Sequence, residues 1–371
     1  MRRLLSGCAL SALILWIVTA GALGGAKPGT RASAASLPGA QAGSSSQELP
    51  SAVRIHAPAG DSSLAALAEV LQTISPKAGG TVGFAMLHIE SGARLSIHGG
   101  ERFPMASVYK IPIALAVLHA VSCDELSLED SVPITAADPR TGSGWIWSHR
   151  RRVRQLPVGE LLEAMLVDSD NTASDILMRL CGGPEAVNEH VRALGVRGVR
   201  VDRYEAAMAL DYAGVAEAPP ESTWTVDALW RLKRDVPLDR RAESAAAFLD
   251  DPRDTATPDA MVDLLARVWR HEALGPDETS RLLEILERVR TGPDRIPGLL
   301  PEGTPVSHKT GTWSTSFGIT AAVNDVGIVT LPDGSHVALA IFVKGTNRGW
   351  RRAERTIAAL ARATYDYWVD E

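Results

Sequence analysis

The sequence predicts an α+β fold, in which an antiparallel sheet built from both termini packs with helices and adjoins an all-helical lobe. Strand-like alternation near residue 81 and again after residue 305 flanks a long middle region with helical periodicity. Hydrophobic residues make up 45% of the 371 positions and charged residues 22%, which allows a large buried core. The same composition excludes a disordered chain, a coiled coil and a collagen-like fibre.

The first residues are typical of a targeting segment. Arg2 and Arg3 precede a short apolar run that small residues follow, so we expect an export signal over residues 1–26. Residues 27–60 are rich in Ala, Ser, Gly and Pro, which predicts a flexible linker. The folded domain is therefore expected to span residues 61–371 and to lie in the periplasm or outside the cell. An uncleaved signal would instead tether this domain to a membrane.

The folded domain is expected to open with a helix and a strand hairpin. Apolar residues recur at helical spacing over 64–74, and residues 81–88 and 93–98 have the pattern of two strands. Residues 107–121 are mostly apolar, which predicts a helix buried on nearly all sides, with Pro112 in its early turns.

The middle and the end of the chain differ in periodicity. Helical spacing predicts two helices within 158–180 and two amphipathic helices at 258–271 and 276–291. After Pro305 the spacing changes to that of strands, which one closing helix follows. The expected strands are 306–310, 318–324, 326–331 and 336–344, and the closing helix is 352–369.

A serine and a lysine at the start of the apolar helix are candidates for catalysis. In Ser107-Val108-Tyr109-Lys110 the two residues are three positions apart and therefore share one face of the helix. From there an amine can take the proton of a hydroxyl, which a weak nucleophile requires. The apolar surroundings would desolvate the amine and lower the pKa of Lys110 towards that of a general base. Taken alone, however, an exposed polar pair explains the pattern better.

Two further motifs follow along the chain. Residues 169–171 (Ser-Asp-Asn) lie between two helical stretches, and residues 309–311 (Lys-Thr-Gly) end a candidate strand. A helix cap explains the former on its own, because all three residue types favour that position. A strand that runs into a turn explains the latter. The order of the three motifs, on a buried helix, between helices and on a C-terminal strand, makes coincidence a poor explanation.

In this order the motifs resemble those of the penicillin-recognising serine enzymes, most closely the class A β-lactamases. The stretch 101–107 is similar to the family's lead-in to its nucleophile, and 203–205 (Arg-Tyr-Glu) is similar to the Arg-x-Glu of its active-site loop. Residues 251–258 resemble the far end of that loop. The resemblance spans about residues 64–369. It implies a serine β-lactamase that opens the lactam amide through an acyl-serine intermediate.

The resemblance implies a catalytic role for each matching residue. Ser107 would be the acylated nucleophile, and Lys110 would be its neighbouring base or proton shuttle. Ser169 would pass a proton towards the leaving nitrogen. Glu205 would activate the water that releases the acyl group. Whether Lys110 or Glu205 is the base for acylation stays open.

The resemblance also implies substrate-binding roles for Asn171, Lys309, Thr310 and Thr312. Asn171 would contact an amide side chain of the substrate, and Lys309 would hold Ser169 and the substrate carboxylate electrostatically. The backbone N–H groups of Thr312 and of the nucleophilic serine would form an oxyanion hole, because negative charge develops on the attacked carbonyl oxygen.

The sequence departs from the family pattern at two positions near the expected site. The family usually has an asparagine four residues after the glutamate, where it helps to hold the deacylating water. Here that position is Ala209, which offers no polar group. Many members also place an arginine after the Lys-Thr-Gly motif to bind the substrate carboxylate, and here Phe317 lies roughly there. Hydroxyls at 314–316 could substitute, or the preferred substrate could lack that carboxylate.

Residues 211–249 form an insertion in the active-site loop. Arg203 and Asp254, which would pair across the neck of that loop, are consequently much farther apart in sequence than in the family. A long insertion beside an active site can be a lid or a binding loop. Alternatively, it can be a surface addition that packs with Trp224 and Trp230 and leaves the site alone.

Four more residues allow two interpretations each. Trp145 or Trp147 could form an aromatic wall at the mouth of the site, although core packing explains them equally well. Cys123 and Cys181 could form a disulfide in an exported protein, or they could be two small buried residues.

The remaining features narrow the function by exclusion. The net charge of −6 removes the electrostatic basis for nucleic-acid binding. No His, Cys or Asp cluster has metal-ligand spacing, so no metal or other cofactor is expected. The expected partner is a small-molecule β-lactam or a related acyl substrate, and we expect a monomer. Two rival functions stay open: a related serine hydrolase or peptidase that acts on another ester or peptide, and a penicillin-binding sensor domain with little turnover.

Overall fold

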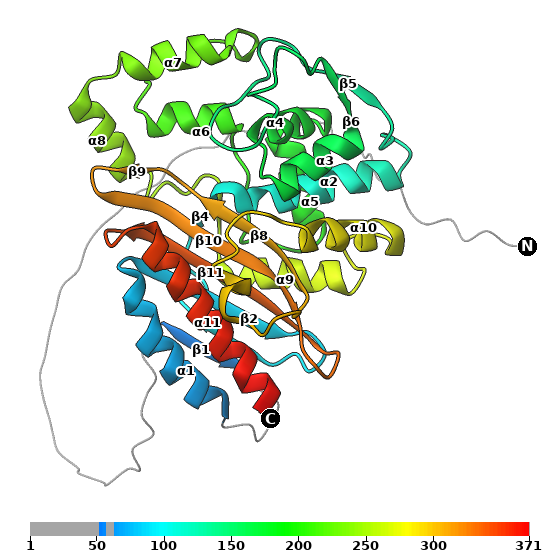
Figure 1. Ribbon diagram of the computed structural model, residues 1–371, viewed down its shortest axis with the longest axis vertical. Coiled ribbons are helices and arrows are strands. Elements are labelled where there is room, and N and C mark those ends of the chain that lie inside the picture. The colour runs from blue at the N-terminus through cyan, green and yellow to red at the C-terminus, as the bar shows by residue number, and fades with distance from the viewer. Residues whose placement is uncertain (1–51, 57–62, 371) are drawn as a thin grey trace, which may run out of the picture. The chain divides into compact units, whose positions relative to one another are not determined.

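A seven-stranded antiparallel sheet forms the centre of the fold (Figure 1). The computed structural model describes residues 52–56 and 63–370. The strands of the sheet are β1 (Val53–His56), β2 (Thr81–His88), β3 (Arg94–Ile97), β8 (Val306–Thr312), β9 (Thr315–Ser316), β10 (Ile319–Thr330) and β11 (His336–Thr346). They lie in the order β1-β3-β2-β11-β10-β8, and β9 pairs with β10. The predicted α+β class, with a sheet built from both ends of the chain, is confirmed.

Both faces of the sheet are covered, because its central strands are apolar on both sides. On β2, Phe84 and Met86 belong to one buried cluster, and the alternate residues Ala85 and Leu87 belong to another. The first cluster lies under α1 (Ser63–Ile74) and α11 (Trp350–Asp370), which pack side by side. The second lies under α9 (Pro258–Trp269), while α10 (Pro276–Glu287) packs on β8. Full burial of a side chain such as Phe84 stabilises the fold by about 2 kcal/mol.

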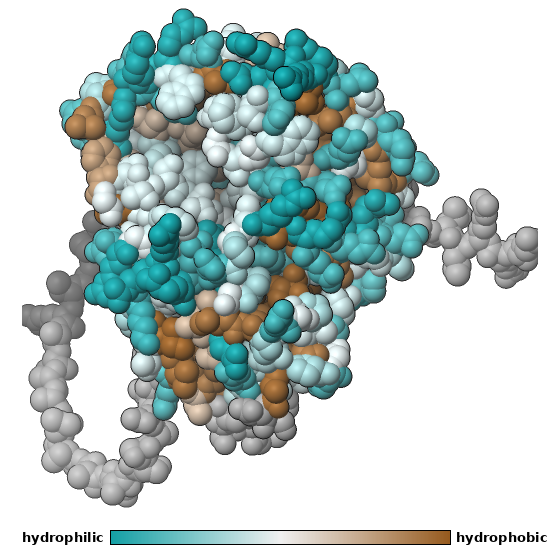
Figure 2. Space-filling model, in the orientation of Figure 1, coloured by the Kyte–Doolittle hydropathy of each residue, from teal (hydrophilic) through white to brown (hydrophobic). Residues whose placement is uncertain are grey.

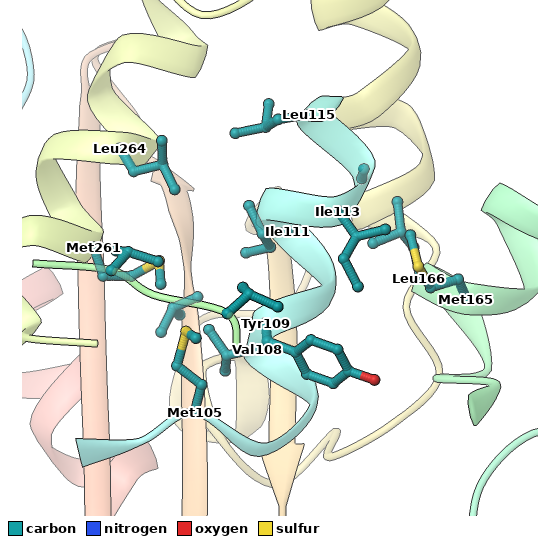
Figure 3. Packing of buried hydrophobic residues seen from close by; sticks show 14 of the residues in the cluster. Met105, Val108, Tyr109, Ile111, Ile113, Leu115, Met165, Leu166, Met261 and Leu264 are labelled. Carbon is teal, nitrogen blue, oxygen red and sulfur yellow. The ribbon is translucent and has the colours of Figure 1, made fainter. Parts of the chain in front are cut away.

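The helical lobe surrounds α2 (Lys110–Ser122), which is buried on almost every side as predicted. Its other helices are α3 (Val158–Val167), α4 (Asn171–Leu180), α5 (Pro184–Ala193) and α6 (Glu205–Tyr212), followed in the insertion by α7 (Val226–Arg234) and α8 (Leu238–Ala247). Figure 3 shows why α2 has no polar face: Ile113 points towards Met165 and Leu166, whereas Ile111 lies on the side of Met261. The first turn of α2, which includes Lys110, therefore lies within the core.

Short strand pairs and 3₁₀ turns complete the fold. The strand β4 (Phe103–Pro104) pairs with β7 (Thr255–Ala256), and β5 (Ser131–Pro133) pairs with β6 (Gln155–Pro157). The 3₁₀ turns are η1 (Ser75–Ala78), η2 (Ala106–Tyr109), η3 (Glu221–Thr223) and η4 (Ile296–Leu299). Because β4 leads into η2 and β7 ends the active-site loop, their pairing ties the two segments together.

The linker prediction for residues 27–60 is wrong at its C-terminal end. Residues 53–56 form β1, which pairs antiparallel with β3 at the edge of the sheet. Val53 and Ile55 pack against the core, while Arg54 and His56 are exposed. This alternation is the signature of a half-buried strand, and it was hidden by the Ala- and Ser-rich composition around it. The predicted export signal at 1–26 and most of the linker lie outside the described residues.

The two strands predicted at 318–324 and 326–331 are one continuous strand, β10. Asp325 suggested a break, but it pairs with Thr310 of β8 and Ile341 of β11. Its carboxylate lies 2.9 Å from His308 Nδ1 and accepts a hydrogen bond from the Ile296 backbone N–H at 3.0 Å. A buried acid with such partners does not end a strand. Among the described helices, none combines the length and apolar character needed to cross a bilayer.

Candidate active site

The predicted nucleophile lies in the turn that precedes α2 rather than within the helix itself. Ser107 is part of η2 and lines a cleft of about 1180 Å³. Ala106 has a φ of 46° and Ser169 has a φ of 56°, both in the left-handed region. Such a conformation costs about 1–3 kcal/mol in a residue other than glycine, so the surrounding contacts must hold it in place. Strain of this kind clusters where a side chain has to be presented for function.

A buried asparagine of the sheet holds the segment before the nucleophile. Asn324 Nδ2 donates to the carbonyl oxygens of Pro104 at 2.8 Å and Met105 at 3.0 Å, and Asn324 Oδ1 accepts from the Val343 N–H at 3.2 Å. Sequence reasoning missed this residue, because an asparagine within a strand pattern has no motif of its own.

The glycine of the Lys-Thr-Gly motif lets β8 approach the nucleophile. A Cβ on Gly311 would lie 2.4 Å from the Met105 carbonyl oxygen and 3.2 Å from the Ser107 nitrogen. No other residue fits there without moving one of the two backbones. This approach brings Thr310 and Thr312 to the cleft beside Ser107.

The amine of Lys110 is fully buried at the base of the cleft. Its Nζ donates to Ser169 O at 2.6 Å, to Ser169 Oγ at 3.1 Å and to Asn171 Oδ1 at 2.8 Å. Burial lowers the pKa of Lys110 to about 8, although the negative charge of Glu205 opposes that shift. In the part of the chain that the structure describes, no hydrogen bond joins Lys110 Nζ to Ser107 Oγ. The predicted desolvation of this lysine is present, but its direct contact with the serine is not.

A second buried amine lies on the opposite side of Ser169. Lys309 Nζ donates to Ser169 Oγ at 3.1 Å and to the Thr310 carbonyl oxygen at 3.0 Å. Burial and the neighbouring charge of Lys110 hold the pKa of Lys309 well below its ordinary value. The hydroxyl of Ser169 therefore accepts from two amines, which leaves its own proton available for transfer into the cleft.

Asn171 bridges Lys110 to the candidate base Glu205. Its Nδ2 donates to Glu205 Oε1 at 3.1 Å, while its Oδ1 accepts from Lys110. Tyr109 donates to Glu205 Oε2 at 3.3 Å, and the Glu205 N–H at the start of α6 donates to Asp175 at 2.7 Å. Burial raises the pKa of Glu205 to about 7, against the opposing effect of Lys110. A carboxyl group with such a pKa can act as a general base near neutral pH.

The neck of the active-site loop is closed by a buried ion pair. Arg203 Nε lies 2.5 Å from Asp254 Oδ2, and the backbone N–H groups of Asp202 and Arg203 donate to Asp254 Oδ1. Arg203 also pairs with Asp211 at 2.7 Å and with Asp251 at 3.1 Å. The predicted Arg203–Asp254 pair is thus present, and it fixes the loop directly before Glu205.

The structure brings all of the predicted site residues together. The cleft is lined by Ser107, Ser169, Asn171, Glu205, Thr310 and Thr312, and Lys110 and Lys309 lie directly beneath it. Figure 2 shows this face of the molecule hollowed between the insertion helices and the sheet. Ala209 also lines the cleft, one helical turn after Glu205. The site therefore has a methyl group at the position where the family pattern has an amide.

Arg295 is a residue of the cleft that sequence reasoning missed. Its buried guanidinium donates to Thr312 Oγ1 at 2.6 Å and pairs with Glu354 at 3.1 Å. Phe317, at the position that was compared with the family's arginine, is 54% exposed and does not line the cleft. Arg295 precedes β8 in a loop, where nothing in the local sequence distinguishes it from other arginines.

The insertion contributes to the cleft, which favours the interpretation as a lid or binding loop over that as a separate surface addition. Trp224 is buried in a small cluster with Ala206 and Leu210 of α6, but Trp230 lines the cleft. At the other end of the insertion, Phe248 stacks on Trp313, with 5.1 Å between the ring centroids. Because Trp313 follows β8 directly, the insertion spans from the catalytic loop to the edge of the sheet.

Trp145, Trp147 and the two cysteines occupy distinct environments. Trp147 lines the cleft, whereas Trp145 packs against the core. Cys123 and Cys181 are not joined by a disulfide, and burial raises the pKa of Cys181 to about 12. Within residues 52–56 and 63–370, no group of three or more His, Cys, Asp or Glu residues is arranged to hold a metal ion.

Comparisons with known proteins agree with this geometry. A model of the β-lactamase enzyme family matches residues 66–368. The extended-spectrum β-lactamase PER-1 of Pseudomonas aeruginosa is 30% identical over 81% of this chain and 87% of its own length. β-Lactamase VEB-1 of the same organism is 29% identical over 78% of this chain and 86% of its own. Among solved structures, a β-lactamase from Chitinophaga pinensis superposes with a TM-score of 0.68 at 31% identity, covering 81% of this chain and 98% of that one.

Proposed function

Since the chain belongs to the β-lactamase enzyme family and is a serine hydrolase of the class A type, we propose that Ser107 opens the β-lactam amide and carries the acyl group. One observation carries this assignment: the hydroxyl of Ser107, two buried amines and one carboxyl group with a raised pKa converge on a single cleft. Such a set can activate a nucleophile, protonate a leaving group and activate water.

Acylation begins with removal of the Ser107 proton. We assign the role of base to Glu205, because Lys110 Nζ donates to Ser169 O, Ser169 Oγ and Asn171 Oδ1. An amine that donates three hydrogen bonds is an ammonium and has no lone pair with which to take a proton. The transfer runs through a water, since Glu205 is hydrogen-bonded to Tyr109 and Asn171 rather than to the serine. Lys110 stabilises the serine oxygen as it becomes negative.

Charge then develops on the lactam carbonyl oxygen and on the ring nitrogen. The backbone N–H groups of Ser107 and Thr312 donate hydrogen bonds to the oxyanion. The close approach at Gly311 brings the Thr312 backbone of β8 beside the nucleophile. As the C–N bond breaks, Ser169 gives its proton to the nitrogen and regains one from the ammonium of Lys110. The proton that Glu205 took from Ser107 then passes through water to Lys110, so both groups regain their starting protonation states.

Deacylation returns the enzyme to its starting state. Glu205 takes a proton from a water that attacks the acyl carbonyl, and the proton returns to Ser107 Oγ as the ester bond breaks. Arg295, Thr310 and Thr312 offer a guanidinium and two hydroxyl groups to the cleft, which suits the carboxylate of a lactam. Because Ala209 cannot hold the water, we expect slower release than the family pattern implies. This residue favours the penicillin-binding sensor as the second candidate function.

The sensor and the hydrolase differ in turnover. The hydrolase releases many equivalents of product from a chromogenic cephalosporin, whereas the sensor stops after one. A single stoichiometric burst without a steady state would therefore reject the hydrolase.

Mass spectrometry of the intact protein during exposure to benzylpenicillin tests the nucleophile. The expected mass gain appears quickly, decays as product leaves, and is absent from Ser107→Ala. The matched control is Ser314→Ala, because Ser314 also lines the cleft and should still become acylated. A mass gain in Ser107→Ala would assign the nucleophile to another residue.

Export and a monomeric state complete the proposal. The basic and apolar start of the chain supports export to the periplasm or outside the cell. A single chain supplies every residue of the site, which supports a monomer. The mass of the exported protein reports its mature N-terminus and therefore distinguishes cleavage from a retained membrane tether.

A further inference from the structure

One face of the insertion helix α7 is directed into the cleft. Val226, Trp230 and Lys233 follow the spacing i, i+4 and i+7, and all three line the same cleft as Ser107 and Glu205. On another face, Arg231 lines a separate hollow between α7 and α8. We call the side of α7 with Val226, Trp230 and Lys233 its cleft face and the side with Arg231 its outer face. Residues on the two faces can be substituted independently.

The position of this helix is fixed relative to the catalytic loop. Leu229 of α7 and Trp224 just before it are buried against Ala206 and Leu210 of α6, the helix that begins with Glu205. Thr225 caps the first turn of α7 by accepting from the Ala228 N–H at 3.3 Å. The α7 face is thus held at the Glu205 side of the cleft as a packed wall.

This wall combines an aromatic ring with a positive charge. The Trp230 side chain lines the cleft and is 59% exposed, so its ring is free to contact a bound ligand. Lys233 Nζ lies 5.4 Å from the centre of the Trp230 ring, and burial lowers the pKa of Lys233. Within the described residues, Lys233 forms no ion pair with a carboxylate. An acidic residue, Asp227, also lines the cleft, but it lies six residues earlier, about 9 Å away along the helix axis.

Two regions of the cleft would contact different parts of the substrate. Arg295 contacts Thr312 of β8, whereas Asn171 contacts Glu205 at the start of α6, on which α7 packs, so the two groups line different parts of the cleft. The acyl side chain of a substrate that is attacked by Ser107 must extend towards this second region. There it meets Trp230 and Lys233.

We propose that α7 forms a subsite for the acyl side chain of the substrate, in which Trp230 packs on an aromatic ring and Lys233 pairs with a carboxylate on that side chain. This inference rests on the proposed β-lactamase function. It identifies the preferred substrates as β-lactams whose side chain is both aromatic and anionic. The insertion, residues 211–249, would thereby determine which acyl side chains the enzyme prefers.

The charge preference is tested with two penicillins that differ by one group. Carbenicillin carries a carboxylate on the side chain of benzylpenicillin, so the ratio of their kcat/KM values isolates that group. Lys233→Met should lower the ratio of carbenicillin to benzylpenicillin about fivefold, the effect of a partly buried ion pair. The control Arg231→Met removes a charge from the outer face of α7 and should keep the ratio of the unmodified protein.

The aromatic preference is tested with 6-aminopenicillanic acid, which lacks the acyl side chain. Trp230→Ala should lower kcat/KM for benzylpenicillin about tenfold relative to 6-aminopenicillanic acid, and Trp230→Phe should restore most of the loss. The control Leu238→Ala removes an exposed apolar side chain from α8 and should leave this ratio unchanged.

The outcomes separate the subsite from the proposed function. Unchanged ratios in active Lys233→Met and Trp230→Ala variants would reject the subsite alone. An equal slowing of both penicillins by Lys233→Met, with acyl-enzyme accumulating, would mean that the lysine acts on Glu205 and its water, and would also reject the subsite. If neither penicillin acylates Ser107 in the unmodified protein, the β-lactamase function itself is rejected.

Discussion

Replacement of Ala209 by asparagine should accelerate deacylation. Position 209 lines the cleft one turn after Glu205, so an amide there lies on the same side of α6 as the carboxyl group. The amide can donate to the water that Glu205 activates. One added neutral hydrogen bond contributes about 1 kcal/mol net, which corresponds to about a fivefold faster step.

The assay follows the acyl-enzyme directly. After a short pulse of benzylpenicillin, intact-mass spectrometry gives the decay rate of the acylated Ser107, and the steady-state kcat should rise in parallel where deacylation limits turnover. Ala209→Leu is the matched control, since leucine has nearly the size of asparagine but no amide. It should slow the decay or leave it unchanged.

An unchanged decay rate in a folded Ala209→Asn variant would refute the reasoning. The hydrolytic water would then lie away from position 209, and the missing asparagine would not limit this enzyme. Equal acceleration by asparagine and leucine would also refute it, because the effect would then come from side-chain volume.

Three further predictions concern the charged groups around Glu205. The deacylation rate should fall as the pH drops below about 7, because burial raises the pKa of Glu205 to about 7 and the protonated acid cannot accept a proton; a rate that stays constant down to pH 5 would contradict this. Glu205→Gln should retain the acyl group on Ser107, and it should raise the free energy of unfolding at pH 8 but not at pH 4. The reason is that a carboxyl group whose pKa is raised on folding costs stability above its unfolded pKa and none below it; urea unfolding at the two pH values measures this. Asp254→Asn should destabilise the protein by about 2 kcal/mol, since it weakens a charge-assisted hydrogen bond of the buried Arg203, which keeps its pairs with Asp211 and Asp251; equal urea midpoints for the two proteins would contradict this.

The candidate site was predictable because its residues lie in short motifs attached to strongly patterned elements. Ser107 lies in the turn before an almost wholly apolar helix that begins with Lys110, and Lys309 lies within the buried strand β8. The hydrophobic pattern fixes where these elements pack, so the motifs meet in the fold. The direct contact between Lys110 and Ser107 was not borne out by the geometry, because Ser169 and Asn171 occupy the donors of the amine.

Other parts depend on partners that are distant in sequence. Asp325 remains inside a strand only because His308 and the Ile296 N–H satisfy its carboxylate. Arg295 reaches the cleft through contacts with Thr312 and Glu354, which no local pattern encodes. Each of these residues looks ordinary until the three-dimensional arrangement is known.

The role of the insertion could not be predicted from the sequence either. Nothing in the sequence around its two tryptophans indicates which one is buried, yet Trp224 is buried and Trp230 lines the cleft. The difference arises because Leu229 and Trp224 dock on α6 and thereby set the rotation of α7. Composition alone could not decide between a binding wall and a surface addition.

The amide of Asn324 couples catalysis to the interior of the sheet. Its nitrogen donates hydrogen bonds to the two carbonyl groups that precede the nucleophilic turn. Its oxygen accepts a hydrogen bond from the backbone of the neighbouring strand β11. A small rearrangement deep in the strands is therefore passed to the attacking oxygen without any contact with the ligand. Substitutions around this amide should alter reaction rates at temperatures far below the melting point. The reaction rate should therefore report changes in the packing of the sheet more sensitively than the melting temperature does.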